Sequence, residues 1–457
     1  MMTHLKRCRR IHGCSGAITI LAIITAMCLS MPSAAWEHHP LITSPVVEGL
    51  AAADVTLQPA AAVPLEDFLM AVEEPLAVLL AEEEAWAQEH LHWHAPLPEA
   101  LAFEATGDPS TIRDRFFRAL RINPDTPTPL YLTVLSGTEI PGAALLPPEA
   151  VTLFPESTGV NRFDFVEVQP GGVLNALDII ATASNEPDFG MDTGLFEDNG
   201  TSFGDVYGFG NQPFGNPDLD YGSQAPFHMG FYHESPLVFL FARFLEKTYP
   251  EYRIRQFKRL SEFAFEHGQE YWGWRFMGWG LHYVGDLSMP YHATVLPGYS
   301  TLRMLWINFL DIVGFPTPVN NALQLVSNRH IAIERYQRIR MERAARRGEA
   351  SIIYETLAAD HEVPSYSDDL PRTALARGAN RMARRLDRAI VRYMPPAFVN
   401  DPSVEVTDEE TLEDIVDIIA DEHGEAALAE LDALIAEALE LFAIYGRSYI
   451  HSILDTR

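Results

Sequence analysis

The residues with the greatest chemical potential lie in one short stretch, GWGLHYVGDLSMPYH, which runs from Gly278 to His292. His282 and Asp286 are four positions apart, so on a helix both side chains leave from the same face. Pro290 would end that helix, and the chain could then turn back and bring His292 into the same space. Converging imidazole and carboxylate groups are the ligands of a divalent metal ion. The alternative is a set of core polar residues that satisfy one another by hydrogen bonds.

A second histidine–carboxylate pair with the same spacing is formed by His330 and Glu334. It lies in the segment 317–347, which carries the signals of a long helix: an N-cap at Thr317, a proline at the first helical position, a basic last turn and a terminating glycine. Taken alone, this pair is also typical of a hydrogen-bonded pair on a helix surface. Two such pairs in one chain favour a metal cluster.

The segments that must position these residues are mostly helical in pattern, so the predicted fold class is mainly α. One helix is expected over 65–90, and from about residue 236 onward helices should dominate, in particular over 317–347, roughly 407–420 and 425–454. Asp108 and Pro109 are the expected N-cap and first residue of a further helix. Residues 123–148 should form short strands or loops, and 190–222 a long loop.

Charge and composition restrict the class of partner. The chain has 457 residues, of which 47% are apolar and 21% charged, and its formal net charge is −30. Residues 1–35 contain four basic residues and no acid, so the remaining 422 residues carry a net charge of −34. Such a body is poorly suited to duplex nucleic acid, whose binding depends on Lys and Arg neutralising phosphates. It would need metal ions to bind phosphate at all.

The first 35 residues are typical of a cleavable export signal. They have a basic start at 6–10, an apolar run at 17–27 and a small-residue cleavage site ending at Ala35. The run is shorter than the ~20 residues that span a bilayer. The expected localisation is therefore secreted or periplasmic. All three cysteines lie inside this segment, so no disulfide-linked partner is expected, and any metal ligands must be His, Asp or Glu.

The ordered set of motifs resembles the zinc-dependent phospholipases C, including alpha-toxin-type enzymes, and the related fungal single-strand nucleases. Their His-x3-Asp-x5-His core matches His282, Asp286 and His292, and their last His-x3-acid pair matches His330 and Glu334. In that family the signal is cut before a tryptophan that binds zinc through its amino group and carbonyl, which the junction Ala35–Trp36 resembles. The family then has a histidine followed two residues later by a branched apolar residue. The remaining matches are His39 in His-Pro-Leu-Ile, Asp188 in Pro-Asp-Phe, and His228 in Phe-His-Met-Gly-Phe-Tyr.

The resemblance implies a helical bundle that holds three zinc ions. The implied ligand sets are Asp188, His228, His282 and Asp286 for one ion, Trp36, His39 and a bridging Asp286 for the second, and His292, His330 and Glu334 for the third. Asp188 is also the implied catalytic residue, as a base or as the group that orients the nucleophile. The catalytic domain would comprise 36–50 and 176–457, with 51–175 as an insertion of unknown role.

Several alternatives stay open for individual ligands. They are His38 in place of His39, His233 in place of His228, and Asp192 in place of Asp188. The histidines of 90–94 could chelate a metal, although the sequence places no carboxylate partner beside them. Residues 198–205 vaguely resemble a calcium loop but lack its alternating oxygen spacing.

The activity implied by the resemblance is hydrolysis of phosphatidylcholine-like lipids, on the glycerol side of the phosphodiester, to diacylglycerol and a phosphorylated head group. The alternatives are a single-strand nuclease and a non-enzymatic lipid-binding protein. Net charge and Glu334, where the nucleases usually have Asp, favour the phospholipase. We therefore expect a phospholipid partner at a membrane or micelle surface and no stable nucleic-acid partner. Residues 302–315, apolar nearly all round, are expected either to enter a membrane interface or to pack as a buried helix.

Overall fold

The computed structural model describes residues 36–52, 55–138, 140–156, 159–215, 220–406 and 410–456. The predicted export signal, residues 1–35, lies outside the described residues. Helices dominate the rest, which confirms the mainly α class. In the part of the chain that the structure describes, no helix is both long enough and apolar enough to span a bilayer.

The α-helices are α1 (His39–Ala52), α2 (Leu65–His90), α3 (Ile112–Leu120), α4 (Ala176–Ala183), α5 (Gly204–Tyr207), α6 (Asp220–Ser223), α7 (Ala225–His228), α8 (Pro236–Phe241), α9 (Pro250–Glu266), α10 (Glu270–Ser288), α11 (Thr301–Ile312), α12 (Thr317–Arg347), α13 (Ile352–Ala358), α14 (Ala376–Tyr393), α15 (Pro396–Val399), α16 (Ile415–His423) and α17 (Glu425–Leu454). The strands are β1 (Ala60–Ala61), β2 (Tyr131–Leu135), β3 (Leu145–Leu146), β4 (Phe163–Glu167) and β5 (Val173–Leu174). They form an antiparallel β1–β5 pair and an antiparallel sheet in the order β2–β4–β3.

Three of the predicted helices, 65–90, 317–347 and 425–454, are confirmed with those bounds as α2, α12 and α17. The N-cap expected at Thr317 is wrong, because Thr317 is the first helical residue and Pro316 precedes it. The helix expected near 407–420 begins later, as α16, because a 3₁₀ turn at Glu410–Asp414 precedes it; residues 407–409 lie outside the described residues. The N-cap expected at Asp108 is wrong. Its carboxylate accepts from the backbone N–H of Ser110 at 2.9 Å and so closes a local turn, and α3 begins only at Ile112.

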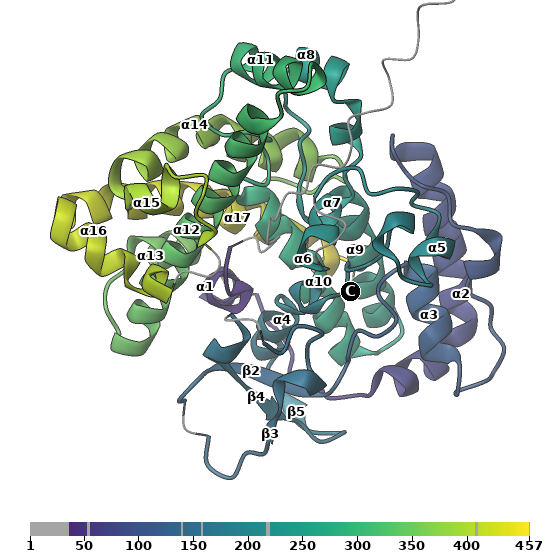
Figure 1. Cartoon of the computed structure of the whole chain (residues 1–457). Helices are drawn as coiled ribbons and strands as arrows, with labels where there is room; N and C mark the ends of the chain where they lie inside the picture. The colour runs from purple at the N-terminus through teal and green to yellow at the C-terminus, as the bar shows by residue number, and fades with distance from the viewer. Residues whose placement is uncertain are drawn as a thin grey trace, which may run out of the picture.

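Helix α10 forms the centre of the molecule, packed against α9, α4 and α17 (Figure 1). Every residue from Tyr271 to Ser288 is buried. Burial on all sides explains why this stretch is apolar or aromatic almost all round. The few polar side chains that it carries are therefore enclosed by protein, and among them are His282 and Asp286.

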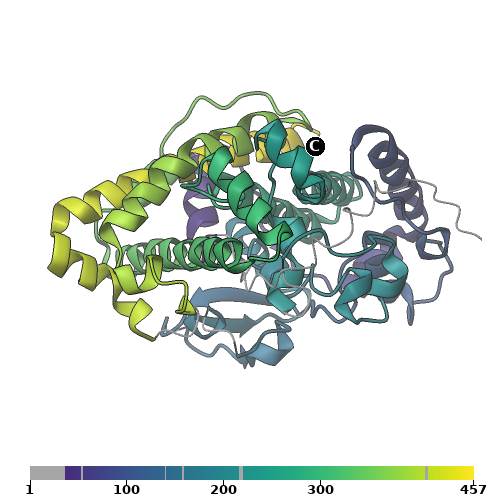
Figure 2. The same ribbon diagram turned by 45° about the horizontal axis from the view of Figure 1, so that its top comes forward.

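The segment 51–175 packs on this helical body. Its two ends meet where Ala60 pairs with Leu174 in the β1–β5 ladder. The Trp272 indole of α10 donates to the carbonyl of Val63 at 2.9 Å, and apolar residues of α2 and α3 belong to the same core as α10. The β2–β4–β3 sheet lies at one end of the molecule, and α8 with α11 lie at the opposite end (Figures 1 and 2).

Candidate metal centre

Six parts of the chain bring the predicted side chains together. They are the first residue of α1, the 3₁₀ turn Glu186–Phe189, the end of α7, the last turns of α10, the turn after α10, and the middle of α12. Three groups result, each with ligand atoms within 4.8 Å of one another: His39, His282 and Asp286; Asp188, His228 and His282; and His292, His330 and Glu334. The first two groups share His282. The third joins them through His292, whose Nδ1 donates to the carbonyl of His228 at 2.9 Å.

In the first group Asp286 is the common neighbour. Its Oδ1 lies 3.3 Å from Nε2 of His39, and its Oδ2 lies 3.4 Å from Nε2 of His282. The His39 and His282 rings are 4.0 Å apart between centroids. Gly285 permits this approach, because a Cβ there would lie 3.3 Å from the His39 ring. All three side chains are fully buried.

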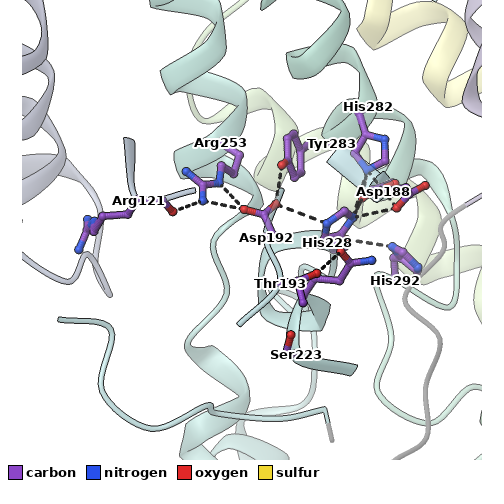
Figure 3. Close-up of polar contacts among 12 residues, drawn as sticks. Arg121, Asp188, Asp192, Thr193, Ser223, His228, Arg253, His282, Tyr283 and His292 are labelled. Carbon is purple, nitrogen blue, oxygen red and sulfur yellow. Dashed lines mark hydrogen bonds and ion pairs between the residues drawn. The ribbon is translucent and has the colours of Figure 1, made fainter. Parts of the chain in front are cut away.

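The second group surrounds Asp188 (Figure 3). Asp188 Oδ1 lies 3.8 Å from Nδ1 of His228 and 3.7 Å from Nε2 of His282. Those two ring nitrogens are 3.1 Å apart, and His228 Nδ1 also lies 2.8 Å from Asp286 Oδ2. The Asp188 side chain is 14% exposed, whereas both histidines are enclosed. Asp188 is therefore the only member of this group whose side chain is exposed to solvent.

In the third group, His330 and Glu334 project from one face of α12 toward His292. His330 Nε2 lies 2.7 Å from Glu334 Oε1, yet neither atom has a hydrogen-bond partner. The His292 and His330 rings meet edge to face with centroids 4.9 Å apart. The i, i+4 spacing seen in the sequence thus places a buried pair, and the surface-pair alternative is wrong for these residues.

Backbone carbonyls orient two of the imidazoles. His282 Nδ1 lies 2.9 Å from the carbonyl of Ser184, and His292 Nδ1 lies 2.9 Å from that of His228. A carbonyl only accepts, so each Nδ1 carries the proton and each Nε2 presents a lone pair to the site. This is the arrangement that fixes the tautomer of a metal-binding histidine.

Asp192 holds His228 from the other side of the ring. One of its oxygens accepts from Arg253 at 2.6 and 2.9 Å, and the other accepts from the Tyr283 hydroxyl at 2.5 Å and lies 3.4 Å from His228 Nε2 (Figure 3). Arg253 in turn donates to the carbonyls of Leu120 and Arg121. Asp192 is therefore tied to Arg253, and Asp188 is the acid that faces His282.

Burial and neighbouring charges shift the pKa values in the site. Burial lowers the pKa of His292 to about 4 and those of His282 and His330 well below the usual value, which keeps these rings neutral. Burial raises the pKa of Asp188 to about 7 and that of Glu334 well above its usual range. For His228 burial acts downward, but Asp286 and Asp192 outweigh it and raise the pKa to about 10.

Unpartnered polar atoms show that these residues fit a metal. Burying a polar atom without a hydrogen bond is costly, and such atoms are rare in folded proteins. In this site they occur together, at both ring nitrogens of His39, Asp188 Oδ1, both Asp286 oxygens, His292 Nε2, His330 Nε2 and Glu334 Oε1. A set of nitrogen and oxygen donors of this kind suits divalent cations such as zinc.

The structure also shows which of the alternative residues lie in the three groups. His38, with a φ of 65°, turns away, so that its Nδ1 lies 3.2 Å from Glu342 and its Nε2 lies 3.0 Å from the carbonyl of Gly159. His233 donates to the carbonyl of Arg372 at 2.7 Å and is not part of the three groups. His39 and His228 take the positions in the site.

The two further metal candidates do not form ligand groups among the described residues. For 90–94, the carboxylate partner that the sequence could not place is Glu84 of α2, which lies 3.0 Å from His94 Nε2. That carboxylate also accepts from the backbone N–H of Leu97, so it fastens the chain that follows α2. In 198–205, Asp198 accepts from the backbone N–H of Gln212.

Trp36 lies beside the centre. Its indole is fully buried, and Nε1 donates to the hydroxyl of Ser288, the last residue of α10, at 2.9 Å. This hydrogen bond holds Trp36, the first described residue, against the end of α10. Its partner Ser288 follows Asp286 by two residues. The Ser288 hydroxyl in turn donates to the carbonyl of Gly285 at 2.7 Å.

Sequence reasoning missed the pair that holds the Asp188 turn. Glu186 receives two hydrogen bonds from Arg275 of α10, at 3.0 and 2.8 Å, and a third from Trp279. On the far side, Phe189 packs edge to face on Phe165 of β4. The spacing of Arg275 and Trp279 by four on α10 was the only signal available, since both lie almost a hundred residues from Glu186.

Comparison with protein-family models, with curated proteins and with solved structures finds no match for this chain. The assignment of a function therefore rests on the residues and geometry described above.

Proposed function

We propose that this protein is an exported zinc-dependent phosphodiester hydrolase, a phospholipase C that acts on phosphatidylcholine-like lipids. The observation that carries the proposal is the convergence of three groups of His, Asp and Glu side chains, all buried except the partly exposed Asp188, in which most ligand atoms have no hydrogen-bond partner. Zinc is the ion chosen because all the donors are nitrogen or oxygen and several are imidazoles.

The ions would be held by His39 and Asp286 together with Trp36, by Asp188, His228, His282 and Asp286, and by His292, His330 and Glu334. Zinc bound in this way lowers the pKa of water toward ~7 and neutralises charge on a phosphodiester. Asp188 is the partly exposed carboxylate of the set, so it is placed to orient a water or accept its proton where substrate arrives. The backbone carbonyls of Ser184 and His228 accept from Nδ1 of His282 and His292, respectively, and so fix the neutral tautomers of these two rings.

The charge of the molecule supports a zwitterionic rather than a polyanionic substrate. Residues 36–457 carry a net charge of −34. That field repels a nucleic acid over long range, whereas it acts weakly on a phosphocholine head group, whose net charge is zero. The acid at position 334 is Glu, as in the phospholipase branch of the resemblance.

The test is a side-by-side assay of one zinc-loaded preparation on phosphatidylcholine micelles and on single-stranded DNA and RNA. We expect release of phosphocholine and little cleavage of nucleic acid. His282→Ala should abolish lipid hydrolysis, because His282 belongs to two ligand groups. His233→Ala is the matched control, since that histidine lies outside the groups and should leave activity unchanged.

Two results would replace the proposal. Efficient degradation of nucleic acid with intact lipid would establish the nuclease alternative. Lipid binding without hydrolysis of either substrate, unaffected by His282→Ala, would identify a non-enzymatic lipid-binding protein.

A further inference from the structure

Helices α8 and α11 concentrate the exposed apolar surface of the molecule. Of the 18 large apolar side chains that are exposed among the described residues, nine belong to residues 237–241 and 302–315. They are Leu237, Leu240, Phe241, Leu302, Trp306, Phe309, Ile312, Val313 and Phe315. Both helices lie together at the end of the molecule opposite the sheet (Figures 1 and 2). We call these nine residues the apolar tip.

On α11 the tip residues follow helical spacing. Leu302, Trp306, Phe309 and Ile312 lie on one face, and Trp306 stacks on Phe309 with centroids 5.8 Å apart. Met304 and Ile307 of the same helix are buried against the body, whereas Leu302 is 78% and Trp306 59% exposed. The expectation of a wholly buried helix is therefore wrong. The inward face of α11 is apolar because it packs on the body. The outward face is also apolar, but no described residue covers it.

A cavity of about 450 Å³ lies beneath the tip, between α8, α11 and the start of α12. Its wall is largely apolar and includes Val238, Phe241, Leu305 and Val319. Val295 and Leu296 also contribute to the wall, and they follow His292 of the third ligand group by three and four residues. The cavity wall therefore includes residues that follow a candidate ligand in the chain, although no residue of the three ligand groups lines it. Its volume is within the range of ligand sites, about 300–1,000 Å³.

The tip is also free of the acidity of the rest of the chain. Residues 293–328 contain one acid, Asp311, and one base, Arg303, and residues 235–248 contain Glu246 against Arg243 and Lys247. Arg303 lies 4.2 Å from the centroid of the Tyr299 ring. Asp198 also lines the cavity, so three acids stand against three bases at this end. In a body of net charge −34 this end is close to neutral and does not repel phosphate head groups.

We infer that the apolar tip is the surface on which the protein docks to a phospholipid layer. Helix α11 would lie along the interface with Leu302, Trp306 and Phe309 among the acyl chains, as interfacial helices do. Large exposed apolar patches mark interaction sites, and an aromatic residue beside bases is the composition of an interfacial anchor. The inference deepens the proposed function and rests on it, since it names how an aggregated lipid substrate is reached.

The experiment measures flotation of the zinc-loaded protein with phosphatidylcholine vesicles. We expect Trp306→Ala/Phe309→Ala to reduce the vesicle-bound fraction at least tenfold. The matched control is Leu145→Ala/Val173→Ala, because those residues are 59% and 74% exposed but lie on the strands at the opposite end. Hydrolysis of a short-chain phosphatidylcholine below its micelle concentration should be the same in all three proteins.

Absence of vesicle binding by the unmodified protein, or equal binding by both double variants, would overturn the inference. So would a dimer in vesicle-free solution that Trp306→Ala/Phe309→Ala dissociates, because the tip would then join two copies of this chain. Failure of the proposed function is distinguishable. If no phosphodiester is hydrolysed but the tip variant alone loses vesicle binding, docking stands without the hydrolase activity.

Discussion

His228 lies between two carboxylates, and their different surroundings separate their roles. Asp286 faces Nδ1 from within the ligand groups, whereas Asp192 faces Nε2 and is held by Arg253 and Tyr283. The guanidinium beside Asp192 outweighs burial and lowers its pKa, so this acid stays ionised. An ionised acceptor on the far side of a ring orients the ring and raises its basicity toward a metal.

Replacement of Asp192 tests this positioning role. We expect Asp192→Asn to weaken zinc binding about 10–100-fold, because an amide orients His228 less well than a carboxylate does. The measurement is zinc titration of the metal-free protein by calorimetry. The matched control is Asp432→Asn, since Asp432 is likewise buried and bonded by an arginine, Arg340, and a tyrosine hydroxyl, that of Tyr336. Equal zinc affinity in both variants would contradict the role.

Glu251 lies apart from the metal centre and makes stability depend on pH. Burial and Asp369 raise its pKa from 4.5 to about 7, although Arg372, 3.2 Å away, opposes them. The folded state therefore prefers the neutral acid, and the stability that this group provides is complete below pH 4.5 and is lost as pH rises through 7.

Glu251→Gln should remove that dependence. We expect the variant to match the parent near pH 4.5 and to exceed it at about pH 8 by on the order of 2–3 kcal/mol in the free energy of unfolding. Urea unfolding at both pH values, with equal zinc, measures the difference. A constant difference between the two proteins across this range would show that Glu251 does not titrate there.

At the scale of elements, two glycines of α10 allow close approach of two different side chains. A Cβ at Gly285 would lie 3.3 Å from the His39 ring, whereas one at Gly280 would lie 1.9 Å from the Tyr449 hydroxyl of α17. The first glycine makes room for a ligand, and the second makes room for helix packing.

Alanine at each position separates these roles. Gly285→Ala should keep the melting temperature within a few degrees. The new Cβ needs only a small shift of the His39 ring, and alanine favours a helix over glycine by about 1 kcal/mol. It should nonetheless reduce zinc stoichiometry, since His39 must shift. Gly280→Ala should lower the melting temperature and leave stoichiometry unchanged. Metal analysis with thermal unfolding measures both, and an unchanged zinc content in Gly285→Ala would refute the assignment.

The elements that sequence could predict are those with local signals. Apolar periodicity indicated α2 and α17, Pro318 and Gly348 marked the ends of α12, and helical spacing placed His282 beside Asp286. The sequence could not show that His39 rather than His38 enters the site, because this depends on a positive φ at His38. The pairing of β1 with β5 and the bond from Arg275 to Glu186 join residues far apart in the chain, where no periodicity operates.

For the whole molecule, metal content should control stability. Residues 36–457 contain no cysteine, and the site places Asp188, Asp286 and Glu334 beside unpartnered ring nitrogens. A ligand that binds only the folded state stabilises it by about 4 kcal/mol at roughly a thousand times its Kd. We expect a chelator to lower the melting temperature and added zinc to restore it, with a smaller change in His282→Ala. Calorimetry after verified metal removal provides the test, and an unchanged transition would count against a bound metal.

The net charge of the whole molecule leads to the last prediction, which concerns salt. Repulsion between the acidic body and a polyanion acts over the Debye length, about 30 Å at roughly 0.01 M salt and about 10 Å at roughly 0.1 M. Any residual cleavage of single-stranded DNA should therefore rise severalfold as salt increases over this range. Hydrolysis of soluble phosphatidylcholine should change little, because its head group has no net charge.

Initial rates on both substrates, with zinc held constant, measure this difference. For a protein that binds nucleic acid through basic side chains, the cleavage rate falls as salt is added, since salt weakens its contacts with phosphate. DNA cleavage that is fast at about 0.01 M salt and falls as salt is added would thus place a basic binding surface beside the metal centre. It would contradict the lipid assignment on electrostatic grounds, independently of which substrate is hydrolysed faster.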